Sequence, residues 1–70
     1  MIAGYCVPRG VDGAAPQMYR MAPKSLLLVC DRSRLQIIAG DVMVWETPEQ
    51  TMPTVFDAAT FAANFEVNEQ

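Results

Sequence analysis

The side chains of this chain that could carry out chemistry are carboxylates and thiols, because the sequence contains no histidine. That absence removes the commonest general base, the Ser-His and Cys-His nucleophile pairs and most zinc sites. Asp41, Glu46 and Glu49 are near enough in sequence to meet at one end of a hairpin, where they could bind a divalent cation or act as acid and base. Their spacing matches no metal-binding loop, so we interpret them as solvated charges. We expect no metal, no cofactor and no catalytic residue.

The two thiols, Cys6 and Cys30, are too far apart in sequence for a Cys-x-x-Cys redox or metal motif. The N-terminus lacks the basic segment and long apolar run of a signal peptide. The longest apolar run, Leu26–Cys30, is far too short to span a bilayer. We therefore expect a cytoplasmic protein that is not bound to a membrane, with two free thiols packed as small hydrophobic groups.

The composition favours binding over catalysis. A chain of 70 residues is close to the lower limit for unaided folding, yet 51% of these residues are apolar and five are methionine. A domain of this size cannot bury so many apolar side chains, and methionine is common on adaptable binding surfaces. It also has little room for a walled substrate pocket. We predict a single domain over residues 1–70 that is not an enzyme and that binds a protein partner or itself, with a dimer favoured.

The charges are unevenly distributed along the chain. All five basic residues lie in the first half, and six of the eight acidic residues lie in the second. This asymmetry could give the folded domain one basic and one acidic side, which suits head-to-tail contact or electrostatic steering. The alternative is that these are ordinary solvated charges. No basic cluster is interleaved with aromatic residues, so we expect no direct binding to nucleic acid.

Turn and strand signals predict a β-rich N-terminal part. Strands are expected at residues 2–7, 17–21, 26–30, 35–38 and 42–46, with a brief return strand from Met52. Residues 8–16 have loop composition and are expected to be mobile, and Pro23 should interrupt the second strand or place it at an edge. The run 26–30 fits a strand buried on both faces and forms a hairpin with 35–38 across the polar turn 31–34. Residues 37–45 suggest a strand pair broken at Gly40-Asp41.

The C-terminal segment predicts a short amphipathic helix. Asp57 is a suitable N-cap and its carboxylate favours the positive end of the helix dipole. Ala58, Phe61, Ala62 and Phe65 then follow at i, i+3, i+4 and i+7, on one helical face. The expected fold class is α+β: a small antiparallel β-sheet or an SH3-like partly open barrel, with this one C-terminal helix.

The strand 42–46 supplies the strongest candidate for a binding surface. Val42 and Val44 share one face of it, and Met43 and Trp45 share the other. One pair should enter the core and something else should cover the other. Trp45 is either an interaction anchor or a cap on the small core, whereas the two tyrosines, at positions 5 and 19, are interpreted as ordinary half-buried strand residues. The predicted partner-binding surface has three apolar anchors and an acidic rim: Met43, Trp45 and Met52, with Glu46 and Glu49.

Residues 39–67 also carry a series of short motifs. A Gly-Asp pair precedes an apolar strand with a tryptophan, then come a turn, a step similar to Tyr-Pro and a Phe-x-x-x-Tyr/Phe-Glu pattern. In order, these are Gly40-Asp41, residues 42–45, residues 47–50, Met52-Pro53, and Phe61 with Phe65-Glu66. In them the chain resembles a group of small phage and prophage proteins. The resemblance covers less than half of the chain. It implies a small β-rich fold with a packed helix and a phage source, and it transfers no catalytic residue.

Three functions are compatible with these observations. A compact acidic phage protein without catalytic groups is expected to bind a host protein stoichiometrically in the bacterial cytoplasm, and so to inhibit or modulate it. An alternative is an acidic mimic of nucleic acid that blocks a host defence nuclease or a CRISPR effector. A second alternative is a minor virion or assembly adaptor, because the apolar excess and the opposite charges of the two halves suit a ring or dimer equally well.

Overall fold

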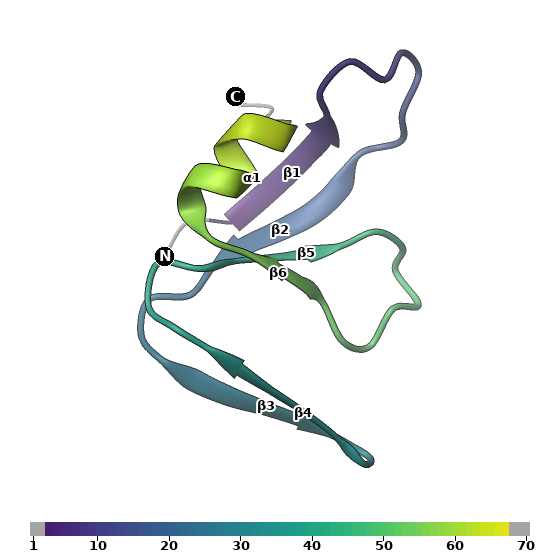
Figure 1. Ribbon diagram of the computed structural model, residues 1–70. Coiled ribbons are helices and arrows are strands. Elements are labelled where there is room, and N and C mark those ends of the chain that lie inside the picture. Colours follow the sequence, from purple (N-terminus) through teal and green to yellow (C-terminus); the bar gives the residue numbers. More distant parts are fainter. Residues whose placement is uncertain (1–2, 68–70) are drawn as a thin grey trace.

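The computed structural model describes residues 3–67, which form seven strands and one helix (Figure 1). The larger sheet is antiparallel and has the strand order β6-β5-β2-β1-β7. Its strands are β6 (Thr54–Phe56), β5 (Val42–Trp45), β2 (Gln17–Met21), β1 (Ala3–Pro8) and β7 (Phe65–Val67). Strands β3 (Leu26–Cys30) and β4 (Ser33–Ile37) form a separate hairpin, and α1 spans Ala58–Asn64. The predicted α+β class with a small antiparallel sheet is confirmed, and β6 and β7 are the edges of the larger sheet.

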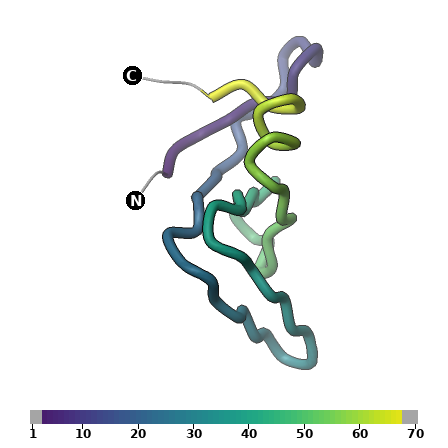
Figure 2. The backbone as a smooth tube through the Cα atoms, turned by 60° about the vertical axis from the view of Figure 1, so that its left-hand side comes forward, coloured from purple at the N-terminus to yellow at the C-terminus, as the bar shows by residue number. Residues whose placement is uncertain are grey.

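The hairpin β3–β4 is a bent continuation of strands β2 and β5. Beyond the two strands, the Ala22 amide donates to the Asp41 carbonyl at 2.8 Å, and the Gly40 amide donates to the Ala22 carbonyl at 2.9 Å. Gly40 has a φ of +92°, a conformation that glycine adopts without the steric cost of a side chain. Past this corner the hairpin turns away from the larger sheet (Figure 2). Strands β4 and β5 therefore lie in different sheets, and the predicted pairing of the segments on either side of Gly40-Asp41 is wrong.

An aromatic cluster joins α1 to one face of the larger sheet. The Phe61 ring lies 5.2 Å from the ring of Tyr19 and 5.3 Å from that of Phe65, measured between centroids. Cys6, Val42 and Val44 complete this part of the core. In Figure 1 the helix crosses this face beside β1 and β2. The helix therefore covers the part of this face that holds the aromatic cluster.

The helix begins as predicted but is shorter than its apolar stripe suggests. Asp57 is the N-cap, and its Oδ1 accepts a hydrogen bond from the Thr60 amide at 2.8 Å. Phe65, however, is already the extended C-cap and first residue of β7, because the chain leaves the helix there to pair with β1. Ala58 and Ala62 are exposed. The predicted four-residue helical face is therefore wrong, and Phe61 is the buried residue of the helix.

The hairpin covers part of the opposite face of the larger sheet. Ala22, Ile37 and Met43 are buried there, and five half-buried side chains pack around them. These are Leu26, Leu28, Leu35, Trp45 and Val55. Strand β5 therefore has both faces covered, since its two valines face the helix side and Met43 faces the hairpin.

The remaining predictions differ from the structure in detail. The first strand is found from Ala3, and Ile2 lies outside the described residues. Strand β2 ends before Pro23 but is paired on both sides, so the edge placement is wrong. Strand β3 is not buried on both faces, because alternate residues of it are exposed. The hairpin turn has two residues, with Asp31 at a φ of +53°. The return strand begins at Thr54, so the predicted start at Met52 is wrong.

Candidate partner-binding surface

Three large apolar side chains form a cross-strand row on the hairpin side of the larger sheet. Tyr5 of β1 is opposite Met18 of β2, and Met18 is opposite Trp45 of β5. Tyr5 is 57% exposed and Met18 is 49% exposed, whereas Trp45 is half-buried against the hairpin core. We call these three residues the open row. The hairpin thus covers the β5–β6 half of this face and leaves the β1–β2 half uncovered.

The open row forms the floor of a hollow of about 650 Å³. The loop between β5 and β6 borders this hollow with Thr47, Pro48 and Gln50. A hydrogen-bond pair fixes the loop, because the Gln50 side chain accepts from the Glu46 amide at 2.8 Å and donates to the Met52 carbonyl at 2.7 Å. One wall of the hollow is therefore held in place by hydrogen bonds between the Gln50 side chain and the backbone of the loop.

A second hollow, of about 320 Å³, lies between the larger sheet and the hairpin. Leu26 and Leu28 of β3 line it on one side and Met43 of β5 lines it on the other. Arg20 and Trp45 border both hollows, so the two adjoin. We call the two hollows together the groove. It runs from the open row to the inner side of β3.

The charged residues that line the groove are both basic. Arg20 borders both hollows and Lys24 borders the second, and no acidic residue is among the described residues of either lining. The chain as a whole carries a formal net charge of −3. The groove is therefore electrostatically unlike the rest of this acidic protein, and it favours an anionic group on whatever enters it.

The structure brings the predicted binding residues together only in part. Met43 is 4% exposed, so it is part of the core and offers no contact to a partner in this fold. Met52 is half-buried in the loop between β5 and β6, and Glu46 and Glu49 are exposed in the same loop. Trp45 is the member of the predicted set that lines the groove. The surface expected from the sequence is thus replaced by one that extends from Trp45 towards β1 instead.

Sequence reasoning missed Tyr5, Met18 and Arg20 as residues of this surface. Tyr5 is exposed instead of half-buried, and Tyr19 is buried in the helix-side cluster. The alternation of β2 does place Met18 and Arg20 on one face and Tyr19 on the other. The row itself depends on the registers of β1 with β2 and of β2 with β5, which no single strand reveals. The row could not be predicted because the sequence does not show which strands pair.

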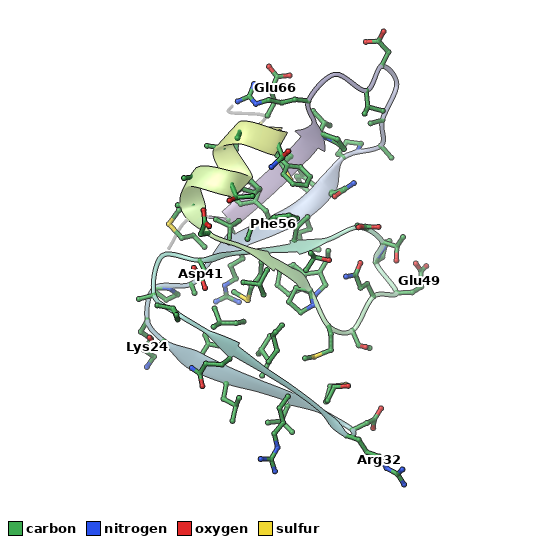
Figure 3. The ribbon with its side chains drawn as sticks, in the orientation of Figure 1. Lys24, Arg32, Asp41, Glu49, Phe56 and Glu66 are labelled. Atoms are coloured by element: carbon green, nitrogen blue, oxygen red, sulfur yellow. The ribbon has the colours of Figure 1, made fainter. Side chains whose placement is uncertain are left out.

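The three carboxylates considered for metal or acid-base chemistry do not form one site. Asp41 precedes β5, and its Oδ2 accepts a hydrogen bond from the Ile38 amide at 3.2 Å. Figure 3 shows Asp41 and Glu49 on opposite sides of the molecule. Within residues 3–67, no group of three histidine, cysteine, aspartate or glutamate side chains is arranged to hold a metal ion.

The two cysteines have different environments. Cys6 is buried beneath the helix, and this burial raises the pKa of its thiol. Cys30 is half-buried at the end of β3, and both thiols are free.

The helix of the described chain, α1, lacks the length and apolar character needed to cross a membrane.

The basic and acidic side chains are only partly separated in space. Lys24 and Arg32 lie at the two ends of the hairpin, while Glu49 and Glu66 lie away from it (Figure 3). Glu66 forms an ion pair with Arg9 at 3.5 Å, which is exposed and therefore contributes little stability. The hairpin is the basic end of the molecule.

Comparison with known proteins gives no relative. No protein-family model, curated protein or solved structure matches this chain. These comparisons therefore supply no function for the chain.

Proposed function

We propose that this chain is a small phage-type accessory protein that binds a host protein stoichiometrically and thereby inhibits or modulates it. The observation that carries the proposal is the open row: Tyr5 and Met18 are aligned on the uncovered half of a sheet face, and Trp45 continues the row at the border of the half that the hairpin covers. A partner that covers this row would remove a contiguous apolar surface from water.

The residue types of the groove support a contact surface. Tryptophan, tyrosine, methionine and arginine are enriched at protein interfaces, and large rigid side chains contribute most to binding energy. The described lining residues include no aspartate, glutamate, histidine or cysteine that could act as a base or nucleophile. The groove therefore offers apolar contact area, one basic region and aromatic anchors. These are the features of a surface that binds another protein.

The host and phage parts of this proposal rest on the resemblance of residues 39–67 to small phage and prophage proteins. A protein without reacting groups can affect a larger host protein by occupying one of its surfaces. This mode of action requires a complex of fixed stoichiometry, and it requires that the open row be at the contact.

Affinity capture from bacterial lysate with matched variants tests the proposal. The test variant carries Tyr5→Ala and Met18→Ala together, and the control carries Val11→Ala, which alters a residue that is 56% exposed in the first loop. Because all three positions are exposed, each substitution should change the free energy of unfolding by less than about 0.5 kcal/mol. Thermal denaturation of each variant checks this.

The parent and the control should retain the same single host protein, and the double variant should lose it. Light scattering of the purified complex should then give a fixed molar ratio. Equal retention by the double variant would exclude the open row as the contact. Retention of nothing by the parent, with self-association of the isolated protein, would favour an assembly component instead.

A further inference from the structure

Strand β3 presents an unprotected sheet edge. In the described chain it pairs with β4 on one side and with no strand on the other. Its sequence, Leu-Leu-Leu-Val-Cys, has neither a charge nor a proline. Soluble proteins usually blunt such edges with lysine, proline or bulges, because unpaired backbone groups can pair with another strand. The two edges of the larger sheet are strands of three residues each, and β4, the other edge of the hairpin, has five residues but carries Arg34, so β3 is the longest edge without a charge.

This edge lies beside the groove. Leu26 and Leu28 line the groove, whereas the alternate residues Leu27 and Val29 point away and are 51% and 61% exposed. A strand added next to β3 would have the same alternation. Every second side chain of the added strand would enter the groove, towards Trp45.

We propose that the groove binds an extended peptide segment of the partner, which adds to β3 as a third strand of the hairpin sheet. The proposal rests on the proposed function and specifies the part of the partner that is recognised. The backbone of the segment pairs with β3 over about five residues, and its alternate apolar side chains fill the groove. The open row contacts these side chains.

The segment also carries an acidic side chain or a terminal carboxylate. Lys24 lies two residues before the start of β3 and lines the groove together with Arg20, and no described acidic residue lines it. An anionic group at the Lys24 end of the segment therefore gains a charge-assisted contact. A basic segment would meet like charges at the same place.

A second copy of this chain fits the edge less well than a peptide. Two copies related by a twofold axis would pair β3 with β3 in antiparallel orientation. With Leu28 at the centre, this pairing brings Lys24, two residues before β3, towards Arg32 in the hairpin turn of the second copy, and the symmetry repeats this approach. Like charges at both ends of the strand pair oppose this arrangement. A peptide brings no such charges.

Selection from a library of random octapeptides displayed on yeast is the first arm of the test. Enriched sequences should alternate apolar and polar residues and contain aspartate or glutamate. Lys24→Glu should abolish the preference for acidic peptides. Arg32→Glu is the matched control, because it makes the same change of charge at the tip of the hairpin, and it should keep the preference. Enrichment of no sequence, or of basic sequences, would overturn the proposal.

N-methylation of the best selected peptide is the second arm and leaves the protein unchanged. In an added strand, alternate amides face β3 and the others face solvent. Methylating the amides that face β3 should weaken binding by about tenfold or more, whereas methylating the other set should have little effect. Equal effects of the two sets would show that side chains alone dock, and would overturn strand addition.

The two proposals fail separately. If the Tyr5 and Met18 variant loses the host protein but no octapeptide binds, strand addition is wrong and the proposed function stands. If octapeptides bind but no host protein is captured, the groove is a peptide site without the proposed host target. If the isolated protein is a dimer whose β3 amides resist hydrogen exchange, the second copy occupies the edge and the peptide proposal is overturned.

Discussion

The two faces of the larger sheet are built from the same strands but are covered to different extents. On one face, α1 and its aromatic cluster bury Cys6, Tyr19 and Val44 across three adjacent strands. On the other face the hairpin covers β5 and β6 but not β1 and β2. Adjacent residues of β2 show the contrast directly, because Tyr19 is 6% exposed and Met18 is 49% exposed. The helix face stabilises the fold, and the hairpin face has apolar surface left for a partner.

Phe61→Ala should produce the largest loss of stability. Phe61 lies on the face of the larger sheet that α1 covers, which we call the closed face. Phe61 packs against two other rings, and its removal should lower the free energy of unfolding by about 3–5 kcal/mol. Such a loss is comparable to the whole stability of a small domain. Urea denaturation followed by circular dichroism measures it. Tyr5→Ala is the control, because Tyr5 lies in the open row on the opposite face. Equal losses of unfolding free energy in the two variants would remove the distinction between the faces.

Ile37→Ala tests whether the hairpin belongs to the same cooperative unit. Ile37 is fully buried between the hairpin and the larger sheet, so the substitution should cost about 2–5 kcal/mol. Val29→Ala, on the exposed side of the same hairpin, should have a much smaller effect. Fluorescence of Trp45 and circular dichroism should give the same denaturation midpoint. Separate midpoints would mean that the hairpin unfolds independently.

The elements of the fold could largely be predicted from the sequence, because their signals are local. Alternation and turn residues identify β2 and the β3–β4 hairpin, and Asp57 marks the start of the helix. The ends of elements were less predictable. Phe65 fits the helical period, yet pairing with β1 draws it into β7. A tertiary contact overrode the local pattern.

The candidate site was less predictable because it depends on packing between distant segments. The alternation of β5 gives two apolar faces but does not show that the hairpin buries Met43 while leaving Trp45 at the rim. The open row joins residues from three strands, and its existence depends on two registers. A free edge such as that of β3 is a property of the assembled sheet. No short motif encodes the burial of Met43, the open row or the free edge of β3.

The N-cap Asp57 makes a smaller, pH-dependent contribution to the stability of the closed face. Hydrogen bonds from Thr60 hold the pKa of the Asp57 carboxyl below its ordinary value. The unfolded chain therefore takes up this proton first as the pH falls, so the N-cap contributes stability above the ordinary pKa and loses it as the pH falls through the lowered pKa. Asp57→Asn should flatten this part of the acid denaturation profile. An unchanged profile would show that the cap does not contribute to the pH dependence.

The reaction rates of the two thiols compare the two regions without any substitution. Cys30 should react with an excess of a thiol reagent in the folded protein, because it is half-buried at the hairpin end. Cys6 is buried and its pKa is raised, so it should react only when the closed face opens. Mass spectrometry of the labelled peptides gives both rates. Equal rates in native buffer would contradict the closed packing beneath α1.

The most direct test of the account is to map the binding face by NMR, with ¹⁵N-labelled protein and the captured host protein or the best octapeptide. The largest changes should occur at Met18, Arg20, the Trp45 indole and β3, with α1 and its aromatic cluster unaffected. Changes centred on α1 and β7 would contradict it, because the face that we assign to folding would then be the face that binds.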